Sequence, residues 1–378
     1  MSTTRFVTAT IAVLPLVLSG CELAPKVSKQ TGFRGTGMAQ VTNTGIVAEQ
    51  AAVPANAYET PDDSGPRASA TYQNVQVLGN VSTDRFNHLM ANMNNWVVPA
   101  AGLPVEQQGC NYCHNPANMA ADTYPDGKPI YTKVVARRMI QMTQSINANW
   151  SNHVQQTGVT CWTCHRGNAI PANYWTLSST PRGERASIVG KKFGQNTPNS
   201  AVGYSSLPYD PFEHYLRGAA DQGSGGPDAI RIASDSQHPS LDHVVSIKDA
   251  EKSYGLMMHV SQSLGVNCTY CHNSQSFRAW NLSSAQRGTA YYGIRMVGNI
   301  NDEYLRELAS VFPAVRKGPQ GDVFKVNCLT CHQGLAKPMN GVSMLPEHPT
   351  LGRPAPGAAP PTAVTVPAAT SLVAAAVR

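Results

Sequence analysis

A five-residue pattern, C-x-x-C-H, occurs four times in this 378-residue chain and constrains it more than any other feature. The copies are Cys110-Asn-Tyr-Cys113-His114, Cys161-Trp-Thr-Cys164-His165, Cys268-Thr-Tyr-Cys271-His272 and Cys328-Leu-Thr-Cys331-His332. They use eight of the nine cysteines, and the one that remains, Cys21, cannot form a disulfide framework by itself. Two thiols at this spacing form thioethers with haem vinyl groups, and the adjoining histidine ligates the iron. The pattern therefore predicts four covalently bound c-type haems.

Paired cysteines have two other common uses. A structural zinc site needs two C-x-x-C pairs brought together. A thioredoxin-like redox pair needs one copy with a lowered thiol pKa. Neither explains a histidine directly after every motif, so both are disfavoured.

The charge of the polypeptide changes once the cofactor is counted. The formal net charge is +6, whereas the propionates of four haems would add about −8 near neutral pH. The loaded protein is thus expected to be near neutral or mildly acidic. Without a basic run in the sequence, nucleic-acid binding has no support.

The N-terminus has the pattern of an export signal. Arg5 precedes an apolar stretch over 6–18. The sequence Leu18-Ser-Gly-Cys21 stands at the end of this stretch. This predicts a signal peptide over 1–20, cleaved before Cys21, and lipidation of Cys21 in the manner of a bacterial lipoprotein. An ordinary signal peptide with a chance cysteine, or an uncleaved anchor helix, remains open. No later segment has the roughly 20 apolar residues of a membrane span, so the body is expected on the periplasmic face of the membrane.

The four motifs fall into two alternating kinds. C-N-Y-C-H-N matches C-T-Y-C-H-N, and C-W-T-C-H-R-G matches C-L-T-C-H-Q-G. This predicts a mainly α fold with extensive irregular chain, built as a duplicated two-haem unit. The expected segments are a lipid-anchored extended arm over 21–70, a first half over 71–170, a connecting segment over 171–240, a second half over 241–345 and a Pro/Ala-rich flexible tail over 346–378.

Apolar residues at spacings of three and four predict helices over about 83–97, 131–150, 246–264 and 290–311, each ahead of or between the motifs. A haem that only transfers electrons needs a sixth ligand, normally Met or His. The residues alone leave the sixth ligand open within three pairs of methionines. A methionine in an apolar stripe is more often part of the packing than a haem ligand. The pairs are Met90 or Met93, Met139 or Met142, and Met257 or Met258.

Several segments closely resemble the tetrahaem cytochrome subunit of photosynthetic reaction centres in purple bacteria and their relatives. They are TGFRG at 31–35, VVARRM at 134–139, QTGVTC at 156–161, YDPF at 209–212, LMM at 256–258, GIRM at 293–296 and CHQG at 331–334. The resemblance runs from this arm to about residue 341. One departure is an insertion over 101–105, between Trp96 and Cys110.

The resemblance implies the axial ligands. Three haems would pair His114 with Met90, His165 with Met139, and His272 with Met257. The fourth would pair His332 with His153, although the repeat itself suggests Met296 as the counterpart of Met139.

The resemblance also implies the function. The chain would pass electrons from a soluble periplasmic donor, a small cytochrome or a high-potential iron–sulfur protein, to the photo-oxidised bacteriochlorophyll special pair. It would dock on membrane-embedded reaction-centre subunits and would not be an enzyme. Two other classes stay open: a multihaem reductase, which needs a haem with an open coordination site, and a tetrahaem carrier serving a respiratory complex.

Overall fold

The computed structural model describes residues 25–30, 39–177, 199–207, 211–217, 230, 232 and 247–352. Within these residues the chain is mainly helical, with long irregular stretches and few strands. This confirms the mainly α, irregular part of the predicted fold class. The predicted signal peptide, Cys21, TGFRG at 31–35, most of the connecting segment and the tail beyond 352 lie outside the described residues.

Four long helices carry the framework: α3 (Thr83–Val97), α4 (Tyr131–Asn149), α8 (Ile247–Leu264) and α9 (Ala285–Asn299). The start of α3 is fixed by Ser82, whose side chain accepts a hydrogen bond from the Arg85 backbone N–H. The end of α8 is fixed by Gly265, which adopts the left-handed conformation with φ +62°. The first three predicted helices are confirmed to within a residue or two.

The fourth predicted helix has the wrong boundaries. It begins at Ala285, five residues early, because Gly288 and Thr289 are weak helix formers that hide its first turn in the sequence. It also changes pitch, passing into a π-helix over Ile300–Leu305 and a 3₁₀-helix over Arg306–Ser310.

Short elements complete the fold. The remaining helices are α1 (Thr44–Ala51), α2 (Ala68–Thr71), α5 (Ser151–Val154), α6 (Cys161–His165), α7 (Pro211–Tyr215) and α10 (Cys328–His332). The strands form two antiparallel pairs, β1 (Lys26–Gln30) with β2 (Ala39–Asn43) and β3 (Tyr174–Trp175) with β4 (Lys325–Val326). Other 3₁₀ turns cover Val105–Gln107, Gly109–Tyr112, Ser200–Val202, Cys268–Tyr270, Ala314–Arg316, Pro338–Gly341, Leu345–Glu347 and Pro349–Leu351.

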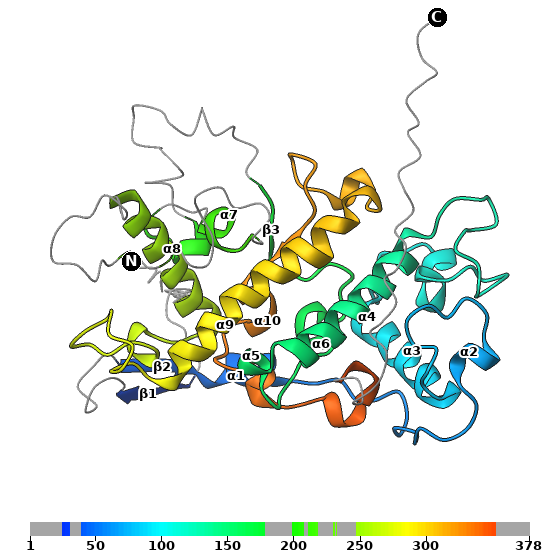
Figure 1. Cartoon of the computed structure of the whole chain (residues 1–378), viewed down its shortest axis with the longest axis horizontal. Helices are drawn as coiled ribbons and strands as arrows, with labels where there is room; N and C mark the ends of the chain where they lie inside the picture. The colour runs from blue at the N-terminus through cyan, green and yellow to red at the C-terminus, as the bar shows by residue number, and fades with distance from the viewer. Residues whose placement is uncertain are drawn as a thin grey trace, which may run out of the picture.

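The molecule is elongated, with α8 toward one end and α2 and α3 at the other (Figure 1). Helices α9, α10, α6 and α4 fill the space between them. Three hydrophobic clusters follow this axis: one around α3 and α6, one between α4 and the π-helix, and one between α7, α8 and α9. The apolar core is therefore a row of small clusters rather than a single centre.

The N-terminal arm spans much of this length. Gln40 accepts a hydrogen bond from the Asn267 backbone N–H at 2.7 Å, next to the third motif. Farther along, the Ala52 carbonyl accepts from the Trp162 indole at 3.2 Å, within the second motif. The arm is not wholly extended as expected, because Asn43 caps helix α1 by accepting from the Gly45 and Ile46 N–H groups.

The C-terminal tail also begins later than expected. Residues 346–352 pack against α4, where the side-chain amide of Asn147 donates to the Leu351 carbonyl at 2.6 Å. Leu351 is fully buried. Its burial offsets the loss of freedom of a Pro-rich segment that reads as a tail in the sequence.

Two buried asparagines fasten the long helices to the chain that enters a motif. Asn147 on α4 donates to the Val159 carbonyl at 2.9 Å and accepts from the Val159 N–H at 2.8 Å. Asn301 makes the same pair with Val326, at 2.9 Å and 2.8 Å. Val159 and Val326 each stand two residues before the first cysteine of a motif.

We expect Asn301→Ala to destabilise the protein by about 3 kcal/mol, because it removes the hydrogen bonds that this side chain makes with the Val326 N–H and with the Leu216 and Val326 carbonyls. Denaturant unfolding followed by far-UV circular dichroism measures this. The control is Asn299→Ala at the end of α9, where the side chain is partly buried and makes no hydrogen bond within the described residues. Equal losses in the two variants would contradict the assignment.

His348 is a buried histidine outside the motifs. It is 1% exposed, stacks on His88 with ring centroids 5.2 Å apart, and meets the edge of Trp96 at 4.5 Å. Within the part of the chain that the structure describes, neither of its ring nitrogens has a hydrogen-bond partner. Burial, with a further contribution from His88, lowers the pKa of His348 to about 4.

The protein should lose stability as the pH falls from about 6.5 to about 4. In this range residue 348 binds a proton in the unfolded chain but stays neutral in the folded protein. At 1.4 kcal/mol per pKa unit, the shift from 6.5 to about 4 corresponds to a contribution on the order of 3–4 kcal/mol. His348→Phe keeps the stacked ring and should lessen this loss. Unfolding free energies of both proteins at pH 7.5 and 4.5 test it; a variant-minus-native difference that is equal at both pH values would refute it.

Candidate functional site

The four motifs adopt two local conformations, matching the two kinds in the sequence. The second and fourth form the short helices α6 and α10, each with a capping box and a left-handed residue after the histidine, Arg166 at φ 49° and Gln333 at φ 50°. The first and third form 3₁₀ turns followed by isolated bridges, Asn115 to Asn118 and Asn273 to Ser276. Like motifs thus fold alike.

Each motif histidine is held by a hydrogen bond between its Nδ1 and a nearby backbone carbonyl. His114 pairs with Met119 at 3.0 Å and His272 with Phe277 at 2.7 Å. His165 pairs with Asn168 at 2.8 Å and His332 with Leu335 at 2.9 Å. Since a carbonyl can only accept, Nδ1 carries the proton and Nε2 keeps its lone pair for a metal.

Burial favours neutral forms of the motif side chains. It raises the pKa of the Cys161 and Cys328 thiols to about 12, and lowers the pKa of His332 to about 4 with a further contribution from His153. Burial also lowers the pKa of His165. Thiols with raised pKa are unlike those of a redox-active dithiol, and neutral imidazoles are what iron requires.

A cavity of about 390 Å³ is lined mainly by the second and fourth motifs, and also by Tyr112 and Cys113 of the first and Tyr270 of the third. Its walls are mostly apolar and come from α4, α9 and the segments around the two motifs. The motif side chains that reach it include Cys161, Cys164, His165, Cys328, Cys331 and His332. An apolar cavity with convergent thiols and imidazoles has the chemistry needed to hold a porphyrin.

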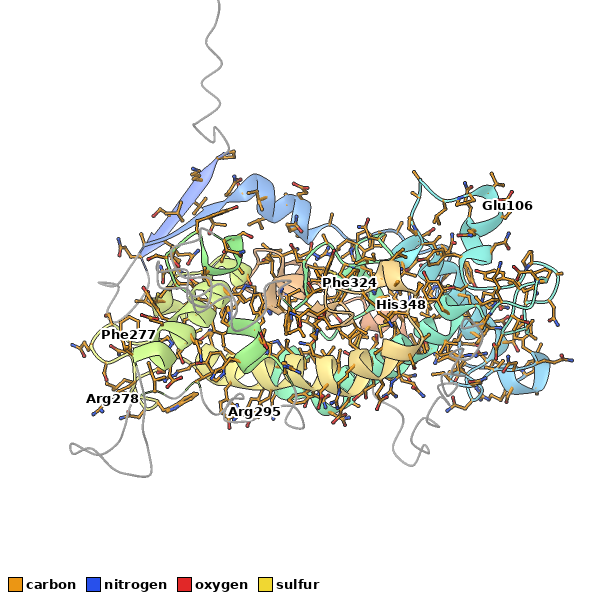
Figure 2. The ribbon with its side chains drawn as sticks, turned by 90° about the horizontal axis from the view of Figure 1, so that it is seen from above. Glu106, Phe277, Arg278, Arg295, Phe324 and His348 are labelled. Carbon is orange, nitrogen blue, oxygen red and sulfur yellow. The ribbon has the colours of Figure 1, made fainter. Side chains whose placement is uncertain are left out.

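The motifs lie in a row whose order differs from the sequence. Cys164 Sγ and Cys331 Sγ are 2.8 Å apart, so the second and fourth motifs meet. Phe277, beside the third motif, lies at one end of the molecule in Figure 2, whereas Glu106, just before the first motif, lies at the other. Phe324, just before the fourth motif, lies between them. The spatial order is first, second, fourth, third.

Helices α3 and α8 occupy equivalent places in the two halves. The Trp96 carbonyl at the end of α3 accepts from the Gly167 N–H at 2.8 Å, after the second motif. The Ser263 carbonyl at the end of α8 accepts from the Gly334 N–H at 2.8 Å, after the fourth. Met90 stands six residues before Trp96, and Met257 stands six before Ser263. Met90 and Met257 are therefore counterparts.

The other methionines of these two helices do not correspond. The counterpart of Met93 in this register is Val260, and the counterpart of Met258 is Ala91. Met93 is also a member of the buried cluster around α3, with Leu89 and Trp96.

Helices α4 and α9 are also equivalent, and in an unexpected register. Lys133 Nζ donates to the carbonyls of Ala120 and Ala121, following the first motif, at 3.0 and 2.7 Å. Arg287 donates to the corresponding carbonyls of Arg278 and Ala279, following the third, at 3.3 and 3.1 Å. Lys133 and Arg287 are separated by the same number of residues as Asn147 and Asn301, so both pairs align α4 and α9 in the same register.

This register corrects the pairing suggested by the repeat. Met139 stands eight residues before Asn147, and the residue eight before Asn301 is Gly293. Met296, expected as the counterpart of Met139, instead corresponds to Met142. The sequence misleads because an Arg-Met pair occurs in both helices, one turn apart.

His153 crosses from the first half to the second. It belongs to α5, yet its Nδ1 pairs with the Thr289 carbonyl of α9 at 2.9 Å. Its ring lies 6.0 Å from that of His332, at an interplanar angle of 65°. Its Nε2, like those of the motif histidines, keeps its lone pair.

The structure thus brings His153 to His332, and it places Met139 on the wall of the central cavity. Met90 packs against the α3 cluster and Met257 against the α8 cluster. The insertion over 101–105 lies in an exposed loop, with Val105 74% exposed, and leaves α3 intact. The sequence carries no sign of a role for Gly293, Lys133 or the two asparagines, because they stand at unequal distances from their motifs and so form no visible pattern.

Comparison with known proteins decides the family. Residues 22–352 match the model of the photosynthetic reaction centre cytochrome c subunit. The chain belongs to this family. A curated member from Rubrivivax gelatinosus is 45% identical over 95% of this chain and 93% of its own length. Another from Thermochromatium tepidum is 41% identical over 91% of this chain and 79% of its own length.

A more distant relative, cytochrome c-554 of Chloroflexus aurantiacus, is 25% identical over 71% of this chain and 70% of its own length. As a reaction centre cytochrome c subunit, the chain carries covalently bound haem and is an electron-transfer component rather than an enzyme. It associates with the reaction centre and so with the membrane. Among the described residues, none of the helices has the length and apolar character to cross a bilayer.

Proposed function

We propose that this subunit holds four covalent c-type haems and passes electrons along them to the photo-oxidised bacteriochlorophyll special pair. The main observation in its support is the common geometry of the four motif histidines, each of which donates a hydrogen bond from Nδ1 to a backbone carbonyl. Covalent attachment would use Cys110, Cys113, Cys161, Cys164, Cys268, Cys271, Cys328 and Cys331. The haems supply the one-electron chemistry, and the polypeptide supplies ligands, burial and spacing.

The proposed Met and His ligand pairs are Met90 with His114, Met139 with His165, and Met257 with His272. The equal positions of Met90 and Met257 in α3 and α8 favour them over Met93 and Met258. Met139 and Met142 both line the central cavity together with His165, and Met139 is the one that the family resemblance implies.

The fourth pair would be His153 with His332. Two nitrogen–metal bonds of about 2.0 Å and two ring radii of about 1.1 Å would separate axial imidazole centres by about 6 Å. The observed separation of 6.0 Å agrees with a metal between the rings. A second imidazole stabilises ferric iron better than a thioether does, so this haem should have a lower potential than the others.

The two halves would form a duplicated two-haem unit, as the paired motif conformations and the matching helix registers suggest. The row of motifs then gives an electron path in which the haems of the second and fourth motifs adjoin at the centre. A soluble donor, a small cytochrome or a high-potential iron–sulfur protein, would deliver electrons to this row. Export and lipidation of Cys21 would hold it on the periplasmic face of the photosynthetic membrane.

Flash excitation tests the relay. In membranes that contain this protein with its haems reduced, a pulse absorbed by bacteriochlorophyll should bleach the reduced haem band rapidly, because the first electron leaves a haem beside the special pair. The control is the same membrane with the haems oxidised beforehand. Active reaction centres that cause no haem oxidation would contradict the relay and favour a respiratory carrier.

His153→Met tests the fourth ligand pair. We expect one of four potentials to rise by on the order of 0.1 V, within the roughly 0.8 V range over which axial ligands act. Redox titration followed in the reduced haem band measures this, after intact mass confirms haem loading. Met142→Leu, a nearby change at a side chain that is not a proposed ligand, is the control. Four unmoved potentials in His153→Met would refute the pair.

A further inference from the structure

One glycine of α9 is in direct contact with the imidazole of His153. A Cβ added at Gly293 would lie 2.4 Å from His153 Cε1, 2.6 Å from Nδ1 and 3.1 Å from Nε2. The two shorter distances are well inside van der Waals contact between such atoms. The imidazole therefore occupies the space that any side chain at residue 293 would need.

The imidazole cannot move aside freely. Its Nδ1 donates to the Thr289 carbonyl at 2.9 Å, one turn earlier on the same helix. The ring also faces His332 of the fourth motif. Adjacent Val154 is buried and anchors α5. A methyl group at residue 293 would thus have to displace the ring from a position with two fixed partners.

Gly293 stands at the position that Met139 occupies in the other half of the duplicated framework, and this links its contact with His153 to haem ligation. Gly293 and Met139 hold the same position, eight residues before the asparagines that clamp α9 and α4. In the first half a thioether side chain projects from this position toward the central cavity. In the second half there is no side chain at all, and an imidazole from the other half fills the place.

We propose that Gly293 selects the axial ligand of the fourth haem. By lacking a side chain where the first half has Met139, it admits the imidazole of His153 and gives this haem a second histidine in place of a methionine. Gly293 is a positioning residue, since it acts through His153. The inference rests on the proposed assignment of His153 to the fourth haem.

The test compares two alanine variants of the haem-loaded protein. Gly293→Ala should displace His153, so the spectroscopic signature of a bis-histidine haem in the near-infrared magnetic circular dichroism of the oxidised protein should be lost and one potential should shift. Gly288→Ala makes the same change in the same helix, where an added Cβ meets nothing within 4 Å. It should leave the signature and all four potentials unchanged. Retention of the signature in Gly293→Ala would overturn the inference.

A double-mutant cycle covers the case in which Gly293→Ala assembles poorly. In a His153→Ala background the ring is gone, so adding Gly293→Ala should cause no further loss of haem loading or thermal stability. An equal loss with and without His153 would overturn the inference, because the alanine would then be clashing with something else.

The same measurements separate this inference from the proposed function. A native protein without any bis-histidine signature would refute the assignment of His153 itself. A native signature that disappears in His153→Ala yet persists in Gly293→Ala would leave the assignment standing and refute only the role of Gly293.

Discussion

The hydrogen bond from each motif histidine to a backbone carbonyl is the interaction on which the rest of the site depends. It fixes the protonated nitrogen, and so it decides that Nε2 is the atom left for iron. The acceptor lies three or five residues after the histidine, within the same short turn. Each site therefore has its proximal side set locally, before any long-range packing is added.

The distal side depends on a framework that is repeated but not identical. Helices α3 and α8 end on the chain after a motif, and α4 and α9 are clamped by equivalent asparagines. Duplication of this kind would give two like pairs of haems if it were complete. The break in the pattern is at Met139 and Gly293, where His153 enters from the other half. In the proposed ligand assignment, one small residue thereby makes the two halves chemically unequal.

Cofactor binding also explains why the polypeptide core is divided. The described chain has three small apolar clusters in a row and a central cavity lined by motif residues. Buried haem faces would join these clusters into a continuous interior. The arm and the segment over 346–352 pack on the outside of the row of clusters. Asn147 holds the segment over 346–352 through its hydrogen bond to the Leu351 carbonyl. Irregular chain suffices there because it packs on fixed helices.

The sequence by itself determined the kind of cofactor, the helical class and three of the four long helices, and it predicted the proximal residues, since these depend on local spacing and periodicity. It reached the family through short specific segments. Only the tertiary structure decided the order of the motifs, the late start of the tail and the register of α9. An Arg-Met pair one turn out of place hid the equivalence of Met139 and Gly293. Such contacts join residues far apart in the chain, and loops of unequal length leave no periodic trace of them.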